Sequence, residues 1–256
     1  MKNHLLICYP EYSDDLVRIN NWEEFGRFNK YFKIFGLRCI RYITGIDNYI
    51  VNNDVAEAIA RQELGNDIKL VKMFLPLPDL KVNNKKNIKA SIVFGTFGVP
   101  SHRKFTCEII EAITILKNVY NLDIVLLIAG YKANEFLKNL NVDKNIVYIY
   151  DNPNDEEFFE LLNSVDYGIQ LRKFAYGESS GPITQLLSLK KEVIVNESFI
   201  DKNFEDYIHV VEDKICINSL ELAKVLKSIL DKNCKLNNIN KDLYSFEVLQ
   251  KLFLEL

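Results

Sequence analysis

From residue 92 onward, short apolar segments alternate regularly with amphipathic segments. The apolar segments at 92–94, 124–129, 146–150, 167–171 and 193–195 are predicted to be buried strands. Helices are predicted between them, at 104–117, 133–140, 155–164 and 182–189, and again from Ser219 and from about Ser245. This alternation predicts βαβ units and a parallel sheet with helices on both faces. Ligands of such sheets bind at the carboxyl ends of the strands, near the switch in strand order.

The first part of the chain carries a shorter version of the same pattern. Strands are predicted at 5–8, 49–51 and 70–75, and helices at 21–35 and 55–63. The first of these helices has one aromatic face, which is expected to pack in a core and contains Trp22, Phe25, Phe28, Phe32 and Phe35. The polar run 81–89 is predicted to be a flexible linker.

The linker divides the chain into three expected parts. Residues 1–85 are expected to form a shortened α/β lobe, and residues 89–240 a larger Rossmann-like domain. Residues 241–256 form a helix that packs back towards the N-terminal lobe. The expected fold class is therefore α/β, with a parallel-sheet C-terminal domain and a smaller, incomplete N-terminal lobe.

Composition excludes several classes of function. A formal net charge of -3 provides no overall positive field for nucleic acid or an anionic membrane. The five cysteines are widely spaced and form no CxxC pair, which argues against structural zinc and a disulfide framework and favours a reducing cytosol. No segment is long and apolar enough for a signal peptide or a membrane span. We therefore expect a cytoplasmic protein that binds no nucleic acid, with peripheral contact to the inner face of the membrane left open.

One loop that follows a predicted strand has features of a phosphate site. It runs from Gly95 to Lys104, and its glycines, its helix start and the cations of Arg103 and Lys104 suit a diphosphate. It has neither the GKS/T ending of a Walker motif nor a GxGxxG pattern. An ordinary solvated turn is the alternative that the loop alone leaves open.

A second loop, from Leu171 to Gln185, combines a carboxylate with a helix start. Glu178 precedes Ser179, Ser180 and Gly181, so an acceptor for sugar hydroxyls stands beside backbone N–H groups that suit a phosphate. Glu178 as a simple helix-cap acid is the alternative reading. Gly130, which ends another predicted strand, is explained best by a tight turn.

Four segments, in order along the chain, resemble the family-four retaining glycosyltransferases of the GT-B class. The segment from Gly95 to Lys104, followed by Ala112, is similar to the G...KG...A segment of that family. Leu127-Ile-Ala-Gly130 is similar to its strand ending in glycine, and 156–166 to its acidic helix ending in Asp. Gly177-Glu-Ser-Ser-Gly181, with the residues up to Val195, is similar to E-x-x-G...E-A-x-x-x-G-x-P-V-I, in the variant with LR...GE-S/T-SG.

The resemblance implies a binding site for a nucleoside diphosphate sugar in residues 89–240, with the lobe of residues 1–85 on the acceptor side. Arg103 and Lys104 match the cations that hold the diphosphate, and Glu178 matches the acid that binds donor-sugar hydroxyls; these are the expected catalytic residues. The expected donor-binding residues contact phosphate, base or ribose, and are Gly95, Thr96, Tyr150, Ser179, Ser180, Gly181 and Gln185. The resemblance also implies retention of anomeric configuration, with no metal and no other cofactor.

The chain departs from the family pattern at several positions. Gln185 stands where the family has its second Glu, and Lys190 and Glu192 replace the Gly and Pro before the next strand. About 85 residues precede the linker, so much of the expected acceptor lobe, with the family's catalytic-site histidine, has no counterpart. None of His4, His102 and His209 has a context that indicates catalysis.

Three functions follow from these patterns. The first is a retaining glycosyltransferase that moves a sugar from a nucleotide-sugar donor to a glycan or lipid-linked acceptor of the cell envelope, in polysaccharide biosynthesis. The second is a degenerate or half glycosyltransferase that binds nucleotide sugar or acts as a scaffold together with a partner subunit or in a homo-oligomer. The third is another doubly wound nucleotide-binding enzyme, such as an epimerase.

Overall fold

The computed structural model describes residues 4–6, 48–82, 84–138, 140–173, 179–232 and 239–254. The predicted helix 21–35 and Glu178 lie outside these ranges. The chain divides into two compact units. The first comprises Met1–Leu75, Ala175–Ser179 and Asp201–Asn203, and the second comprises Pro76–Phe174, Ser180–Ile200 and Phe204–Leu256.

In its described residues, the first unit contains a small parallel sheet and helix α3 (Asp54–Leu64). Its strands lie in the order β1 (His4–Leu6), β2 (Asn48–Val51), β3 (Lys69–Lys72). Helix α3 connects β2 to β3, and the apolar face of the helix is buried. Among the described residues of this unit, one buried apolar cluster consists of Tyr49, Val51, Ala56, Ala60, Leu64 and Ile68.

Asn53 and Gly65 define the two ends of α3. The Asn53 side chain accepts a hydrogen bond of 2.8 Å from the backbone N–H of Ala56, so it satisfies a first-turn donor. Gly65 ends the helix with a positive φ of 107°, where a side chain would be strained. Both ends of the helix therefore have a local cause in the sequence.

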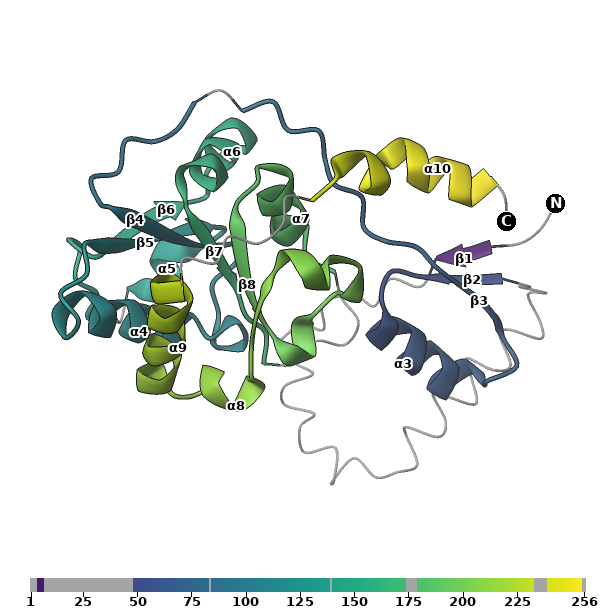
Figure 1. The fold of residues 1–256 in the computed structure, drawn as a ribbon, viewed down its shortest axis with the longest axis horizontal. Helices are drawn as coiled ribbons and strands as arrows, with labels where there is room; N and C mark the ends of the chain where they lie inside the picture. The colour runs from purple at the N-terminus through teal and green to yellow at the C-terminus, as the bar shows by residue number, and fades with distance from the viewer. Residues whose placement is uncertain are drawn as a thin grey trace. The chain divides into compact units, whose positions relative to one another are not determined.

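The second unit is built on a six-stranded, entirely parallel sheet (Figure 1). Its strand order is β6-β5-β4-β7-β8-β9. The strand bounds are β4 (Ile92–Phe97), β5 (Ile124–Gly130), β6 (Val147–Asp151), β7 (Tyr167–Gln170), β8 (Glu192–Asn196) and β9 (His209–Val211). The expected fold class, α/β with a Rossmann-like parallel sheet beside a smaller α/β unit, is confirmed.

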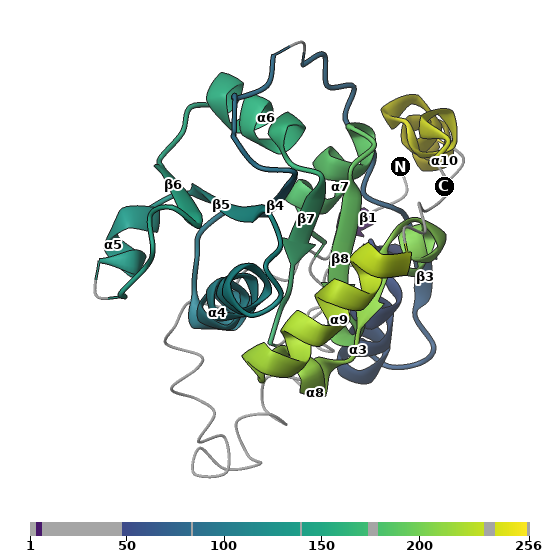
Figure 2. The same ribbon diagram turned by 60° about the vertical axis from the view of Figure 1, so that its left-hand side comes forward.

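Helices cover both faces of this sheet, as Figure 2 shows. One face carries α4 (Thr106–Asn118), α8 (Asp213–Cys216) and α9 (Ser219–Lys232). The other carries α6 (Asp155–Ser164) and α7 (Gly181–Ser188). Two more helices, α5 (Ala133–Leu137) and α10 (Phe246–Leu254), belong to the same unit.

The main core lies between the sheet and the layer formed by α4 and α9. Every residue of β5 is buried, as expected for a central parallel strand covered on both faces. Among the large apolar side chains of this cluster are Phe94, Ile109, Ile113, Leu116, Leu126, Ile128 and Leu226. Its residues come from β4, β5 and α4 early in the unit and from α9 near its end, so segments far apart in sequence share one core.

Several elements differ from the sequence prediction. β4 continues to Phe97, three residues beyond its predicted end, so Gly95 and Thr96 lie in the strand and not in the loop after it. A 3-10 turn, η2 (His102–Lys104), precedes α4, which begins at Thr106. Strand β9 and helix α8 were not predicted, because each is short and β9 lies at the sheet edge.

The polar segment 81–89 contains no described helix or strand, but it lies against α6. The Asn163 side chain donates to the carbonyl of Asn84 at 3.1 Å, and the backbone N–H of Lys86 donates to Ser164 Oγ at 2.7 Å. The Lys86 ammonium also approaches Glu157 and Glu160 at 3.3 and 3.4 Å. The segment belongs to the second unit, and the division of the chain falls after Leu75.

In the part of the chain that the structure describes, no helix combines the length and the apolar character that crossing a membrane requires.

Candidate functional site

The strand order defines one switch point in the six-stranded sheet. From β4 the chain continues to β5 and β6 on one side, whereas β7, β8 and β9 are added on the other side. β4 and β7 are therefore neighbours whose following loops leave in opposite directions. This is the position at which open parallel sheets bind their ligands, at the carboxyl ends of the strands.

The two central strands pair over only part of their length. The ladder between β4 and β7 joins Phe94 to Tyr167 and Gly95 to Gly168. Beyond it, β4 continues its pairing with β5, and β7 continues with β8 through Gln170. The pairing at the switch point thus ends before either strand does, as a crevice between their carboxyl ends requires.

A backbone hydrogen bond connects the loops that follow β4 and β7. The N–H of Lys173 donates to the carbonyl of Arg103 at 2.7 Å. The loop that carries the predicted cations Arg103 and Lys104 is therefore held against the start of the loop that leads to Glu178. The sequence identified both loops separately, and the tertiary structure brings them together.

The side chain of Lys104, from η2, reaches the end of β4. Its ammonium donates to the carbonyl of Phe97 at 3.3 Å, and a Cβ added to Gly98 would lie only 2.8 Å from its Nζ atom. Gly98 has a positive φ of 86°, which favours glycine. This glycine therefore allows both the turn and the close approach of the lysine side chain.

Gly130 has a packing role at the same edge. The N–H of Gly98 donates to the carbonyl of Ala129 at 2.9 Å, and a Cβ added to Gly130 would overlap the carbonyl oxygen of Gly98. The two strand ends are thus in backbone contact. This close approach adds a physical reason for glycine beyond the tight turn that the sequence favoured.

Two predicted donor-binding residues lie inside β4. Gly95 is buried, and an added Cβ would lie 2.6 Å from Val165 Cγ1 and 2.7 Å from the Phe97 ring. Thr96 is also buried and pairs with Ile128 of β5. Side-chain packing explains the glycine at position 95, inside the strand. Gly98 is the glycine that follows the end of the strand.

The described end of the second loop forms the start of α7. Ser180 precedes the helix, but its hydroxyl makes no capping hydrogen bond and has no partner within the described structure, although the residue is buried. Gly181 and Pro182 begin the helix, whose first-turn N–H groups lack intrahelical partners. The Oε1 atom of Gln185 is also buried, and no described residue forms a hydrogen bond with it.

Tyr150 lies near the end of β6, where its register partner is Ala129 of β5. It is half-buried and lies at the same edge of the sheet as the two loops. The predicted residues Arg103, Lys104, Tyr150 and Ser180 thus all belong to the carboxyl edge. The position of Glu178 relative to them stays a prediction.

The sequence analysis missed the group that fixes the chain as it leaves β7. Asn196, the last residue of β8, accepts from the backbone N–H of Arg172 at 2.7 Å and donates to its carbonyl at 2.8 Å. It also donates to Asp213 at 2.6 Å, and the Arg172 guanidinium lies 5.1 Å from the centre of the Phe199 ring. Only the Leu171-Arg172 pair of the resemblance pointed to this position, because the contacts join residues far apart in sequence.

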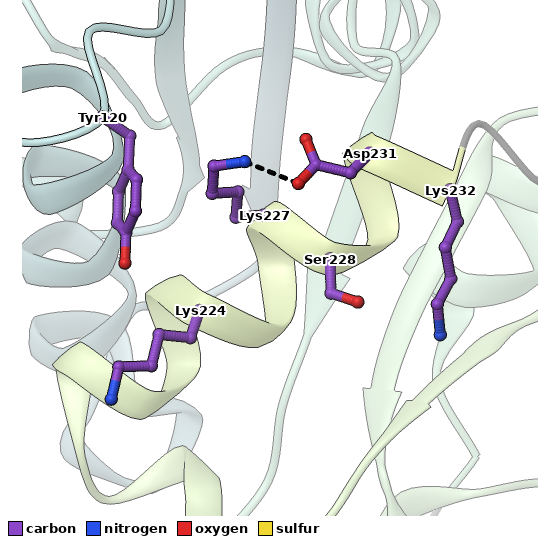
Figure 3. A pocket seen from close by; sticks show the side chains of 6 residues that line it. All are labelled: Tyr120, Lys224, Lys227, Ser228, Asp231 and Lys232. Atoms are coloured by element: carbon purple, nitrogen blue, oxygen red, sulfur yellow. Dashed lines mark hydrogen bonds and ion pairs between the residues drawn. The ribbon is translucent and has the colours of Figure 1, made fainter.

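A separate hollow of about 310 Å³ lies between the end of α4 and α9 (Figure 3). It is lined by Tyr120, Lys224, Lys227, Ser228, Asp231 and Lys232. Lys224 donates a hydrogen bond to Glu221 at 2.6 Å, and Lys227 donates one to Asp231 at 2.5 Å. These carboxylates compensate much of the positive charge around the hollow. Because α4 runs away from the carboxyl edge after β4, this hollow is at the opposite edge from the switch point.

Within the ranges described, no three His, Cys, Asp or Glu side chains gather in an arrangement that could hold a metal ion.

Comparison with known proteins gives a result only at the level of structure. No protein-family model and no curated protein sequence matches the chain. The crystal structure of Alr3699/HepE from Anabaena in complex with UDP-glucose superposes with a TM-score of 0.63 at 13% identity, over 89% of this chain and 68% of that one. A glycosyltransferase from Rickettsia africae ESF-5 gives a TM-score of 0.60 at 13% identity, over 82% and 62%. The GtfA/B complex gives 0.63 at 9% identity, over 84% and 46%.

At these identities the likeness establishes a shared fold. The fold is that of the GT-B glycosyltransferases, as the resemblance implied. The chain spans between 46% and 68% of the length of the three structures.

Proposed function

We propose that this chain binds a nucleoside diphosphate sugar at the carboxyl ends of β4 and β7 and transfers the sugar to a glycan or lipid-linked acceptor. The observation that carries the proposal is the 2.7 Å hydrogen bond between Lys173 and Arg103, which joins the two loops at the switch point. A cationic loop and a helix start at one crevice provide what a diphosphate needs. The structural similarity to Alr3699/HepE, which was crystallised with UDP-glucose, supports the same class of ligand.

In this proposal Arg103 and Lys104 bind the diphosphate and stabilise the negative charge that develops on the leaving nucleotide. The first-turn N–H groups of α7, with Ser179, Ser180 and Gly181, bind the distal phosphate. Glu178 accepts hydrogen bonds from the sugar. Tyr150 contacts the base, and Gln185 contacts the ribose without the charge of the family's Glu.

The finer features rest on the resemblance to family-four enzymes. We propose retention of the anomeric configuration and transfer without a bound metal, so activity should persist in EDTA. We also propose that the chain acts in polysaccharide biosynthesis at the cytoplasmic side, where peripheral contact with the membrane would bring it to lipid-linked acceptors.

The first test is calorimetric titration with UDP, GDP, ADP and their sugars, followed by transfer assays with a lipid-linked acceptor. Lys104→Ala should weaken binding by about 1.5–3 kcal/mol, because it removes a charge-assisted hydrogen bond. Glu178→Ala should reduce transfer more than nucleotide binding.

Lys224→Ala is the matched control, because it removes the same charge from α9 at an exposed position bonded to Glu221. It should leave binding unchanged. If the wild-type chain binds none of these nucleotides, or if both lysine variants lose affinity equally, the proposed site is wrong.

A second candidate is a nucleotide-sugar-binding subunit that needs a partner chain for transfer. Gln185 in place of the family's Glu favours this candidate. The structural similarity to the GtfA/B complex supports it as well. Binding without transfer, with activity restored by a co-purified partner, would distinguish this candidate from the first.

A further inference from the structure

Gln170 is a buried polar residue that the fold does not use. It is the last residue of β7 and only 1% exposed, yet among the described residues neither Nε2 nor Oε1 has a hydrogen-bond partner. Buried polar side-chain atoms are nearly always hydrogen-bonded, because burial removes their bonds to water. A completely unpaired amide therefore requires an explanation.

Packing does not explain an amide at this position. Leucine or methionine would fill a similar volume without the loss of hydrogen bonds to water. Its neighbours in sequence, Ile169 and Leu171, are apolar and fully buried. An amide at this position is explained if its partner comes from outside the chain.

The position of Gln170 directs it towards the candidate site. Side chains alternate along a strand, so Gln170 lies on the same face as Gly168. That face is covered by α7, since a Cβ added to Gly168 would overlap Leu186. As α7 runs antiparallel to β7 in the β7-α7-β8 crossover, the first turn of the helix lies near Gln170, beyond the point where pairing with β4 ends.

Two further unpaired groups belong to the same supersecondary unit. The hydroxyl of Ser180 precedes α7, and the Oε1 atom of Gln185 lies in its second turn; both are buried without a hydrogen-bond partner. Together the three residues offer both donors and acceptors. A phosphate carries acceptors only, so it would leave the amide oxygens facing negative charge, whereas a hydroxyl both donates and accepts.

We propose that Gln170 determines specificity at the crevice between β4 and β7, where its amide forms hydrogen bonds with a hydroxyl of the ribose or the sugar of the bound donor. This inference rests on the proposed nucleotide-sugar site and assigns to it a residue that no motif identifies. A site built to bond a hydroxyl rejects an analogue that lacks it, because the polar group of the protein is then left unpaired.

The experiment compares Gln170→Met with the wild-type chain. Ligands are tested in matched sets: UDP, 2′-deoxy-UDP and UDP-glucose, with the corresponding GDP, 2′-deoxy-GDP and GDP-mannose, and ADP, 2′-deoxy-ADP and ADP-glucose. Gln170→Met should melt at the same temperature as the wild type or higher without ligand, yet bind the preferred nucleotide sugar roughly tenfold or more weakly.

The ratios of affinities give the decisive readout. If the partner is a ribose hydroxyl, the preference for the ribonucleotide over its 2′-deoxy analogue should fall in the variant. If it is a sugar hydroxyl, the preference for the nucleotide sugar over the free nucleotide should fall instead. A variant that is merely less stable would lose affinity for all ligands by one factor, so unchanged ratios overturn the proposal.

Gln62→Met on α3 is the control, since Gln62 is exposed and the substitution is the same. It should change neither melting temperature nor affinity. A lower melting temperature for Gln170→Met with unchanged affinity would show that the amide is structural and overturn the inference alone. If the wild-type chain binds no member of any set, the proposed function fails and this inference fails with it.

Discussion

At the residue scale, Lys191 is a lysine whose pKa is lowered by burial. Its ammonium donates to the carbonyl of Asn163 at 2.6 Å, just before β8 begins. Burial lowers the pKa of Lys191 to about 8, and repulsion from Lys85 acts in the same direction. The charge is therefore held in the folded chain at a cost in free energy.

This lowered pKa predicts how stability depends on pH. Between about pH 8 and the ordinary lysine pKa of 10.5, the unfolded chain holds the Lys191 proton and the folded chain releases it. Stability rises with pH wherever the unfolded state binds more protons. The melting temperature of the wild type minus that of Lys191→Met should therefore increase between pH 7 and pH 10.

Lys190→Met controls for the loss of a positive charge, because Lys190 is the exposed neighbour. Thermal melts of the three proteins in one buffer series measure the effect. A difference between wild type and Lys191→Met that stays flat or falls with pH would contradict the prediction.

Residues also show where local sequence is insufficient. Gly95, Gly98 and Gly130 were all recognised near strand ends, but their roles differ. Gly98 needs a positive φ, whereas Gly95 and Gly130 avoid overlap with atoms of other segments. Those neighbours are known only once the strands are placed side by side.

At the element scale, the packing of α7 on β7 positions the helix start. A Cβ added to Gly168 would overlap Leu186 Cδ1, so Gly168→Ala must push the helix away from the strand. Overpacking of this kind costs about 1–3 kcal/mol. We expect an apparent melting temperature lowered by about 2–4 °C for each kcal/mol.

Gly181→Ala is the matched control within the same helix. Among the described residues, no atom outside the adjoining residues and the helix backbone lies within 4 Å of a Cβ added to Gly181. Alanine also has a higher helix propensity than glycine. Its melting temperature should equal or exceed that of the wild type. Equal destabilisation by both substitutions would show that the contact between β7 and α7 does not limit stability.

Most elements could be predicted from sequence, because apolar periodicity is local. Strands β5, β6 and β8 and helices α6 and α7 lie close to their predicted ranges. The end of β4 was placed too early, because glycine and threonine within a buried strand look like the start of a loop. The short edge strand β9 gave no periodic signal.

At the scale of the whole molecule, the second unit has its own core. The main cluster extends from Phe94 to Leu226, and the six strands of the sheet all lie after Leu75. A domain with its own core can fold alone. Residues 76–256, expressed alone, should therefore melt cooperatively, which circular dichroism measures.

This fragment should also keep nucleotide affinity, because both switch-point loops lie within it. Titration with the nucleotide preferred by the full chain tests this point. A fragment that melts without a cooperative transition would show that the unit depends on the first 75 residues for its fold.

The sequence by itself determined the fold class and identified the two candidate ligand-binding loops. It could do so because strand and helix periodicities and glycines near strand ends are local properties. It also supplied Arg103, Lys104 and Glu178 as candidates. Only the tertiary structure decided that β4 and β7 are neighbours, that their pairing stops early, and that Lys173 bonds Arg103. It alone left the amide of Gln170 buried without a partner. Strand order and side-chain burial depend on how the whole sheet buries its apolar surface, which no local segment encodes.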